Sequence, residues 1–351
     1  MAVATGARLS TTSEGLWLTA ALCGISRLPR ALKVRPTDGI EGADLSSHPG
    51  IAVLQEAGVY GNGAVDADVA QWVMTLGRPD IEVTVEVNVP AAPSDRLLGP
   101  PPVFTATADL AAISKGGDAA IEAYAQLLEW RKQQPPQRIA TLCCRDGSWV
   151  SAARVWSSAD ESSAESDDQS TGELDEVPSA ESDDQSTGEL DEVVVTPLGR
   201  KPVGTSILEL LGSTGPAEFR GLSVNSRVLD SIVSQWQHDP DGNNLVAQLV
   251  DELEISAEQA RIIEAVGDQS AARATIGACE YHFDGPRTAQ KAMLVTDTIY
   301  GRVLVSGDTG FDDQEWTMLT PGTEARIQSA LDEVLSSLPC GSEWLHYRRH
   351  S

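Results

Sequence analysis

The spacing of apolar residues along the chain predicts amphipathic helices interspersed with alternating strands. Residues 66–76 (DADVAQWVMTL) place Val69, Trp72, Val73 and Leu76 at positions i, i+3, i+4 and i+7, which is typical of a helix with one apolar face. Residues 81–89 (IEVTVEVNV) alternate apolar and polar side chains, which predicts a strand with one solvent-exposed face. Similar patterns predict further helices at Ser13–Cys23, Ile51–Ala57, Asp118–Lys132, Ser206–Leu211, Val224–Gln237, Leu245–Leu253, Ala257–Val266 and Thr323–Leu338.

Short apolar runs separated by turn residues predict the remaining strands. RIATLCC and WVSAARVW flank the turn RDGS, in which Asp146 and Gly147 supply the backbone freedom that a β-hairpin needs. Both halves of the chain mix helices with such strands without a regular βαβ alternation, so we expect an α+β fold. The other predicted strands are VVVTPLG, Ala272–Phe283, Lys291–Thr298, Arg302–Ser306 and Trp316–Leu319.

A duplicated acidic segment separates the two halves. SAESDDQSTGELDEV occurs at Ser163–Val177 and again at Ser179–Val193, and residues 160–192 hold fourteen acidic residues and no basic one. With few apolar residues and no aromatic one, the segment cannot offset its ordering entropy by burial, so we expect a disordered inserted loop. The predicted organisation is therefore an N-terminal half at 1–156, the disordered repeat at 157–193, and a C-terminal half with a helical region at 194–351.

Charge and cysteine content narrow the possible partners and compartment. The net charge of −27 disfavours binding to nucleic acid or to anionic membranes. The sequence contains neither a run of about 18 apolar residues nor a signal-peptide pattern, so we expect a cytoplasmic protein without membrane insertion. The five cysteines form no CxxC pair, which indicates reduced thiols in apolar surroundings.

Three stretches resemble chemical motifs without matching them. GRKPVGTS at 199–206 lacks the lysine that a phosphate loop requires, and DPDGNN at 239–244 lacks the glycine position and the terminal glutamate of a calcium loop. Cys340, His346 and His350 fit no zinc spacing. The sequence therefore predicts no catalytic residue, no metal and no cofactor, and we expect a protein that is not an enzyme.

Several blocks together resemble the EspG family of proteins associated with type VII (ESX) secretion in mycobacteria. They are GLWLTAALCGISRLPRAL and HPGIAVLQEAGV near the start, RDGSWVSAARV in the middle, and VTDTIYGRVLVSGDTGFDDQEWTMLTPGTEARIQSALDEVLSSLPCGSEW near the end. The resemblance implies two quasi-symmetric halves, each with an antiparallel sheet beside helices. It also implies a cytosolic chaperone that binds PE–PPE heterodimers at the apolar tip of the PPE protein. The acidic duplication departs from the family pattern.

The resemblance also implies where a client would bind. The family's groove lies against the C-terminal helical region, and a chaperone of this kind is expected to be a monomer or a weak homodimer. Plain core packing is the competing interpretation for each apolar residue of such a set. The alternative function is an acidic binding or regulatory protein that holds a basic partner with its repeat. By position, the expected groove residues are Leu245, Leu249, Leu253, Ile262 and Ile263, with Asn243, Asn244, Glu252, Arg287 and Gln290 at the rim.

Overall fold

The computed structural model describes residues 3–5, 8–34, 45, 48–88, 137–157, 190–201, 203–238, 244–268, 271–310 and 314–349. One unit contains residues 1–90, 138–154 and 192–351, while the second unit, Ala91–Gln137 with Val155–Asp191, falls almost entirely outside the described residues. The predicted helix Asp118–Lys132 and the acidic repeat up to Glu189 lie outside the described residues. The predicted disordered loop 157–193 needs correction at both ends, because Ser157 and Leu190–Val193 belong to strands and Val193 is buried.

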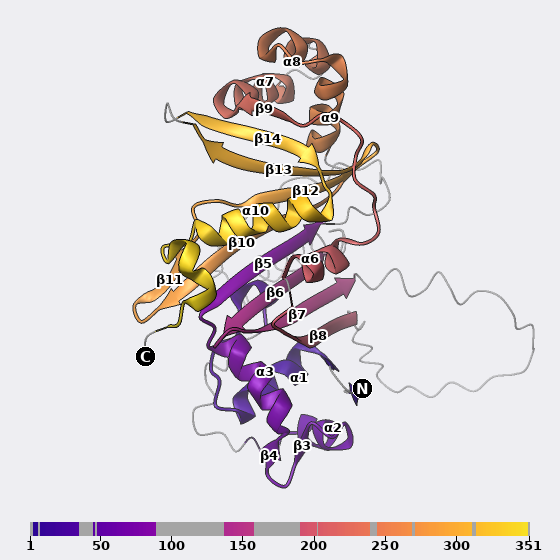
Figure 1. The fold of residues 1–351 in the computed structure, drawn as a ribbon. Helices are drawn as coiled ribbons and strands as arrows, with labels where there is room; N and C mark the ends of the chain where they lie inside the picture. The colour runs from indigo at the N-terminus through magenta and orange to yellow at the C-terminus, as the bar shows by residue number, and fades with distance from the viewer. Residues whose placement is uncertain are drawn as a thin grey trace, which may run out of the picture. The chain divides into compact units, whose positions relative to one another are not determined.

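A single large sheet organises the first unit (Figure 1). Within the described residues it has twelve strands, in the order β1-β2-β8-β7-β6-β5-β10-β12-β13-β14-β9, with β11 paired to β10. The strands are β1 Val3–Thr5, β2 Arg8–Thr11, β5 Ile81–Asn88, β6 Gln137–Arg145, β7 Ser148–Ser157, β8 Leu190–Gly199, β9 Leu222–Asn225, β10 Ala272–His282, β11 Gly285–Thr288, β12 Met293–Thr298, β13 Gly301–Thr309 and β14 Glu315–Pro321. A separate hairpin pairs β3 Tyr60–Gly61 with β4 Ala64–Val65.

The two halves of the chain meet at the antiparallel pair β5 and β10, which runs from Ile81 opposite Glu280 to Asn88 opposite Arg273. Outward from this pair, β6-β7-β8-β2 on one side correspond to β12-β13-β14-β9 on the other. Within the described residues, three α-helices follow β2 and three follow β9, and one α-helix follows each of β8 and β14. The expected α+β fold with two quasi-symmetric halves is confirmed, and the strands of both halves belong to one sheet. The predicted domain boundaries stay a prediction.

Helices cover both faces of the sheet. In the second half, α7, α8 and α9 pack against β9, β13 and β14, whereas α6 and α10 pack together over β5, β6, β10 and β12. On β13, Leu304 joins the α6–α10 core and its neighbour Val303 joins the α7–α9 core. These two helical groups therefore lie on opposite faces. The helices are α1 Ser13–Leu22, α2 Gly50–Glu56, α3 Ala67–Gly77, α6 Val203–Leu211, α7 Ser226–His238, α8 Leu245–Leu253, α9 Ala257–Gly267 and α10 Glu324–Ser336, with short 3-10 helices at Arg30–Leu32 (η1) and Gly341–His346 (η4).

Local sequence explains many of these boundaries. The side chain of Asp66 caps α3 by accepting hydrogen bonds from the backbone N–H groups of Asp68 and Val69. The turn between β6 and β7 has positive φ at both Asp146 and Gly147, as a two-residue hairpin requires. The predicted helices 66–76 and 245–253 and the predicted hairpin are thus confirmed.

Two further predictions need correction. The predicted helix Val224–Gln237 begins later, because Leu222–Asn225 forms β9 by pairing with β14 and α7 starts only at Ser226. The polar face of β5 is not wholly solvent-exposed, since Glu82 is buried. Its carboxylate accepts hydrogen bonds from the hydroxyls of Tyr281 and Thr141, at 2.5 and 3.1 Å.

A buried arginine ties α6 to the β12–β13 hairpin. The Arg302 guanidinium donates to both carboxylate oxygens of Asp297, at 2.7 and 3.0 Å, and to the carbonyl oxygens of Leu211 and Gly212 at the end of α6. Arg302 is almost fully buried. Arg302 therefore satisfies two of the carbonyl groups that the end of α6 leaves without helical partners.

The C-terminal segment packs over the end of the central strands. The Glu280 carboxylate accepts a hydrogen bond from the Cys340 N–H at 2.9 Å and lies 2.5 Å from His282 Nε2. The Tyr347 hydroxyl donates to the Tyr281 carbonyl oxygen, and the Arg349 N–H donates to Asp80. Residues 340–349 are thereby held to β5 and β10.

Candidate functional site

Helices α8 and α9 form the region in which the sequence places a binding groove, and both have defined ends. The Asn244 side chain caps α8 by accepting from the Ala247 N–H at 3.1 Å. At α9, Ser256 Oγ accepts from the Gln259 N–H and Gln259 Oε1 accepts from the Ser256 N–H, a reciprocal capping box. The Gln259 amide also donates to the Arg220 carbonyl oxygen, which fixes α9 to the loop before β9.

The predicted apolar residues do come together, as core. Leu249 has no exposed surface, and the others are buried or half-buried in the cluster that α7, α8 and α9 form over β9, β13 and β14. In this arrangement they pack beneath the outer surface of α8 and α9 and do not form that surface. Their assignment to a client groove stays a prediction. The five residues are Leu245, Leu249, Leu253, Ile262 and Ile263.

The predicted polar rim residues are distributed over two regions. Asn244, the N-cap of α8, and Glu252 on α8 are exposed, and Asn243 lies outside the described residues. Arg287 lies on β11, where it pairs with Asp284 at 3.2 Å, and the Gln290 N–H donates to the Ser337 carbonyl oxygen. Since β11 pairs with the last four residues of β10 and α9 precedes its first residue, an eleven-residue strand of about 36 Å separates these two sets.

The surface between α8 and α9 contains a groove of about 610 Å³, here called the α8–α9 groove. Its wall on α8 combines two half-buried valines with an exposed alanine and Asp251, and its wall on α9 has one alanine and two charged residues. These positions follow helical spacing on the side of each helix turned away from the core. The lining residues are Asn244, Val246, Ala247, Val250, Asp251, Ala257, Arg261, Glu264 and Tyr300.

The turn between β12 and β13 has two large exposed apolar side chains, of which one lines the groove. Ile299 is 86% exposed and its neighbour Tyr300, which lines the groove, is 45% exposed. The turn is well held, because Thr298 Oγ1 accepts from the Tyr300 N–H and donates to the Gly301 carbonyl oxygen. Exposed apolar side chains on a fixed turn are typical anchors for a protein partner.

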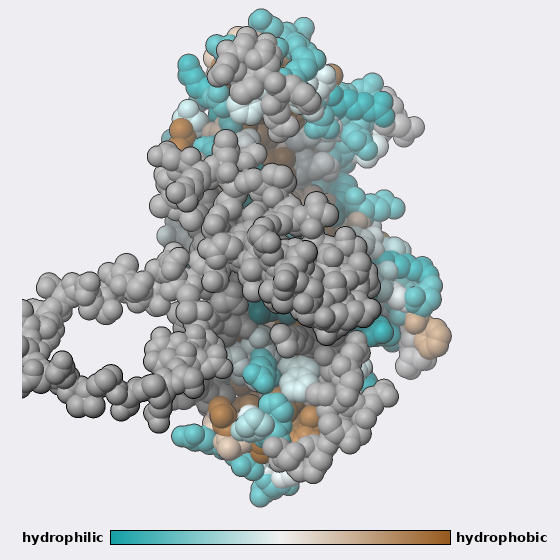
Figure 2. All heavy atoms as spheres, turned by 180° about the vertical axis from the view of Figure 1, so that it is seen from behind, coloured by the Kyte–Doolittle hydropathy of each residue, from teal (hydrophilic) through white to brown (hydrophobic). Residues whose placement is uncertain are grey.

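Of the groove residues, sequence reasoning found only Asn244. It selected the stripe of leucines and isoleucines with the strongest helical periodicity, and that stripe is the core. The sequence signal for the groove is weaker: a second stripe of Val246 and Val250 on α8, and the two apolar residues of the DTIYGR turn. On the face that Figure 2 shows from behind, the described residues at the α7–α9 end are mostly hydrophilic.

Several titratable groups near the end of β10 are engaged in internal contacts. Burial would raise the pKa of Glu280, but hydrogen bonds from Cys340 and His282 outweigh it and lower that pKa. Burial and the nearby Glu82 raise the pKa of Tyr281, and burial raises the pKa of Cys144 to about 11 and that of Cys340 to about 12. At neutral pH these thiols are protonated and poorly nucleophilic.

Neither a metal site nor a membrane span is found within the described ranges. No group of three or more histidine, cysteine or acidic residues there is arranged to hold a metal ion. No helix in the same ranges is long and apolar enough to cross a membrane.

Comparison with known proteins finds similarity over almost the whole chain. The sequence model of the EspG family matches residues 12–333. The ESX-5 secretion-associated protein EspG5 of Mycobacterium tuberculosis strain H37Rv is 22% identical over 351 residues, which cover 97% of each chain. The ESX-2 secretion-associated protein EspG2 of Mycobacterium tuberculosis strain CDC 1551 is 23% identical, with 97% of this chain and 99% of the relative covered.

A solved structure shares the fold. It is the Mycobacterium tuberculosis type VII secretion system chaperone EspG5 in complex with a PE25–PPE41 dimer, and it superimposes with a TM-score of 0.63 at 20% sequence identity. The match covers 98% of this chain and 100% of the EspG5 chain. The likeness therefore includes the helical region that carries the α8–α9 groove.

Proposed function

This chain belongs to the EspG family, and we propose that it is a cytoplasmic chaperone of type VII secretion that binds PE–PPE heterodimers and acts by binding alone, without catalysis. The α8–α9 groove receives the apolar tip of the helical PPE protein. The chaperone keeps the heterodimer soluble until it reaches the secretion machinery.

One observation carries the proposal: the α8–α9 groove combines apolar and charged side chains, and exposed Tyr300 and Ile299 lie on the adjoining turn. An exposed apolar helix tip promotes aggregation, and covering it with a groove of matching chemistry removes that apolar surface from water. Helix-in-groove binding is an established mode of such recognition. The fold likeness to an EspG5 chain that was solved with a PE–PPE dimer supports the same assignment.

Charges at the groove give the interaction its selectivity. Asp251, Arg261 and Glu264 lie among the apolar residues, so a client needs complementary charges at these positions. Leu249, Ile262 and Ile263 hold the two helices in place from the core side. Glu252, Arg287 and Gln290 are exposed and available to a client that extends beyond the groove.

Co-expression tests the proposal directly. The chain is produced with PE–PPE pairs encoded beside it, and the products are separated by size-exclusion chromatography. We expect a stable ternary peak, and we expect the pair to be insoluble when this chain is omitted. If every neighbouring pair is soluble alone and elutes separately, the chain does not have this function.

Matched variants then locate the site. Ala247→Asp and Tyr300→Asp each place a charge in the groove at a position that is already exposed, so the fold should persist and the ternary peak should be lost. Val53→Asp on α2, where Val53 is 52% exposed, adds the same charge elsewhere and should leave the peak intact. Equal behaviour of all three variants would remove the groove from the proposal.

A further inference from the structure

A second groove lies on the opposite face of the sheet, between α6, α10, η4 and the β6–β7 turn. Its volume is about 450 Å³, within the range of about 300–1,000 Å³ that ligand pockets occupy. It has no lining residue in common with the α8–α9 groove. The two grooves are therefore separate sites, and the second is here called the α6–α10 groove.

The floor of the α6–α10 groove is apolar and rigid. Trp149, Leu331 and Leu335 are buried members of the core beneath α6 and α10. On the open side, Trp344 is half-buried and Leu345 is 57% exposed, both on η4. A large apolar side chain entering the groove would contact aromatic and aliphatic surface on several sides.

The rim carries two cations that have no acidic partner among the described residues. Arg200 and Lys201 follow β8 in a tight turn, in which the Lys201 N–H donates to the Leu198 carbonyl oxygen and Gly199 has φ of +61°. Both side chains are exposed. The turn therefore presents two adjacent positive charges at the mouth of an apolar groove.

The acidic residues of the same groove are already engaged. Asp146 lies 3.8 Å from the Arg348 guanidinium and 3.7 Å from that of Arg145. Asp332 accepts a hydrogen bond from the Gln328 amide at 3.0 Å. Arg200 and Lys201 thus remain available to an acidic ligand, in a chain whose net charge is −27.

We propose that the α6–α10 groove binds a short acidic peptide segment of a partner protein. One large apolar side chain of the peptide enters the groove beside Trp344, and two carboxylates of the peptide pair with Arg200 and Lys201. The GRKPVGTS stretch, which fails as a phosphate loop, supplies these two cations.

Two features favour a peptide over a phosphate group or a polyanion. The Gly204 N–H in the first turn of α6 is already taken by Gln328 Oε1 at 3.1 Å, so that backbone donor does not face an anion. A nucleic acid or an anionic membrane would meet the repulsion of the whole acidic chain. A short peptide mainly feels charges within the screening length of about 8 Å at physiological salt.

A random-peptide display selection on the full chain tests this inference. We expect enriched sequences to combine acidic residues with Leu, Phe or Trp. A synthetic fluorescein-labelled copy of one such peptide should bind the full chain in an anisotropy titration. Raising the salt from 50 to 500 mM should weaken this binding several-fold, because exposed charge pairs are screened.

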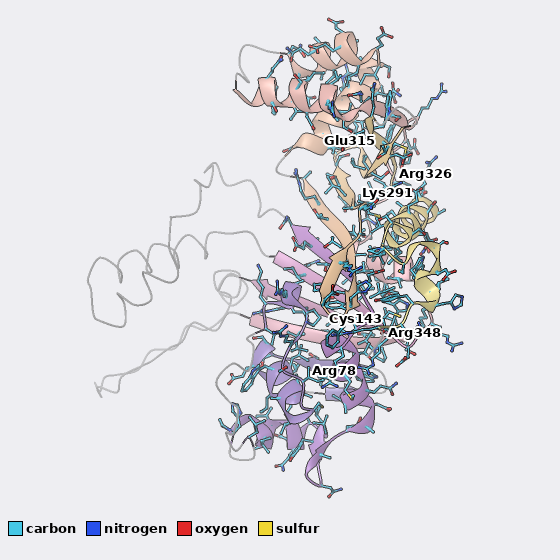
Figure 3. The ribbon with its side chains drawn as sticks, turned by 90° about the vertical axis from the view of Figure 1, so that its left-hand side faces the viewer. Arg78, Cys143, Lys291, Glu315, Arg326 and Arg348 are labelled. Atoms are coloured by element: carbon cyan, nitrogen blue, oxygen red, sulfur yellow. The ribbon has the colours of Figure 1, made fainter. Side chains whose placement is uncertain are left out.

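Variants assign the binding to the groove. Arg200→Glu combined with Lys201→Glu should weaken peptide binding at least tenfold, and Leu345→Asp should do the same through the apolar wall. The control combines Arg326→Glu with Arg227→Glu, which changes the net charge equally at exposed sites outside the groove. Figure 3 shows that Arg326, a control position, lies well away from Arg348, which lines the groove.

Either of two results would overturn the inference. One is a selection without enrichment of acidic residues, and the other is a peptide that binds the groove variants as tightly as it binds the parent chain. Because the two grooves differ, the Arg200 and Lys201 variant should still form the ternary peak with a PE–PPE pair. Failure of the chaperone proposal and failure of this one are thus separate observations.

Discussion

At the scale of single residues, the side chain of Arg302 connects two elements of the fold, the β12–β13 hairpin and the end of α6. Its fork of donors reaches the carboxylate of Asp297 and the last carbonyl groups of α6 at once. Removing one member of a buried ion pair leaves the other charge without a partner in a poorly hydrated site.

Arg302→Ala should therefore lower the free energy of unfolding by about 3–5 kcal/mol. Arg302→Lys keeps the charge but not the planar fork, so its loss should be intermediate. Urea unfolding followed by circular dichroism measures both. A loss below about 1 kcal/mol for the alanine variant, typical of an exposed pair, would show that the pair contributes little.

Glu280 gives the stability a dependence on pH. Its pKa in the folded state lies below the ordinary 4.5, so the charged form that accepts from Cys340 is favoured by folding. This contribution is fully present above pH 4.5 and is lost as the pH falls through the folded-state pKa.

Glu280→Gln should be less stable than the parent by about 1.5–3 kcal/mol at pH 7, the value of a hydrogen bond to a charged group. Below pH 4.5 the difference should shrink, because the parent then loses the same charge. Urea titrations at pH 7, 5 and 3.5 compare the two proteins. A difference that does not change with pH would mean that the carboxylate is not the stabilising form.

The roles of single residues were harder to predict from the sequence than the helices and strands or the fold class. The apolar residues selected on α8 and α9 have the periodicity of a buried face, and periodicity does not distinguish a core from a groove that lies behind it. Glu82 is buried because Tyr281 and Thr141 from other strands satisfy it. Partners so distant in the sequence cannot be identified from the pattern of apolar and polar residues around Glu82.

At the scale of elements, helix ends decide how firmly the α8–α9 groove is built. The capping box at the start of α9 satisfies backbone donors that the helix leaves open, and Ala257, Arg261 and Glu264 line the groove directly after it.

Ser256→Ala should cost about 1 kcal/mol of stability, because the N–H of Gln259 loses its acceptor. Ser256→Asp retains an acceptor and should be nearly neutral. Hydrogen exchange of the first α9 amides, read by mass spectrometry, should be faster in the alanine variant alone. Equal exchange in both variants would show that packing, and not the cap, holds this end.

Elements were predicted well where local signals suffice and missed where pairing creates them. Helix α8 begins at an Asn cap and has a complete apolar stripe, so Leu245–Leu253 was predicted with its observed bounds. Strands β9 and β11 have four residues each and exist through pairing with β14 and β10. Four residues provide too short a pattern to identify a strand.

At the scale of the whole molecule, residues 158–189, which hold the acidic repeat up to Glu189, are expected to be dispensable for folding and client binding. Strands β7 and β8, which flank these residues in sequence, are neighbours in the sheet. Loop-closure entropy changes only slowly with length, so a short linker can replace residues 158–189.

A chain with residues 158–189 replaced by a short Gly-Ser linker should unfold within about 1 kcal/mol of the parent, since the closure term changes by only about 0.6 kcal/mol per doubling of length. It should also retain the ternary peak with a PE–PPE pair. Loss of that peak in the deletion, together with strong salt sensitivity in the parent, would favour the alternative in which the repeat holds a basic partner.

The α+β class and the doubling of the fold could be expected from the sequence and its family resemblance, whereas the joining of both halves into one sheet could not. The joining depends on β5 and β10, and Glu82 and Tyr281 on these strands are 199 positions apart. Nothing in either strand identifies the other as its neighbour.

That separation has a consequence for biosynthesis. At about 5–20 residues per second, β5 would wait about 10–40 s after leaving the ribosome before β10 follows it. During this interval the inner edge of β5 offers unpaired N–H and C=O groups to any other nascent strand. A protein proposed to protect others from aggregation would thus itself pass through an aggregation-prone stage on every round of its own translation.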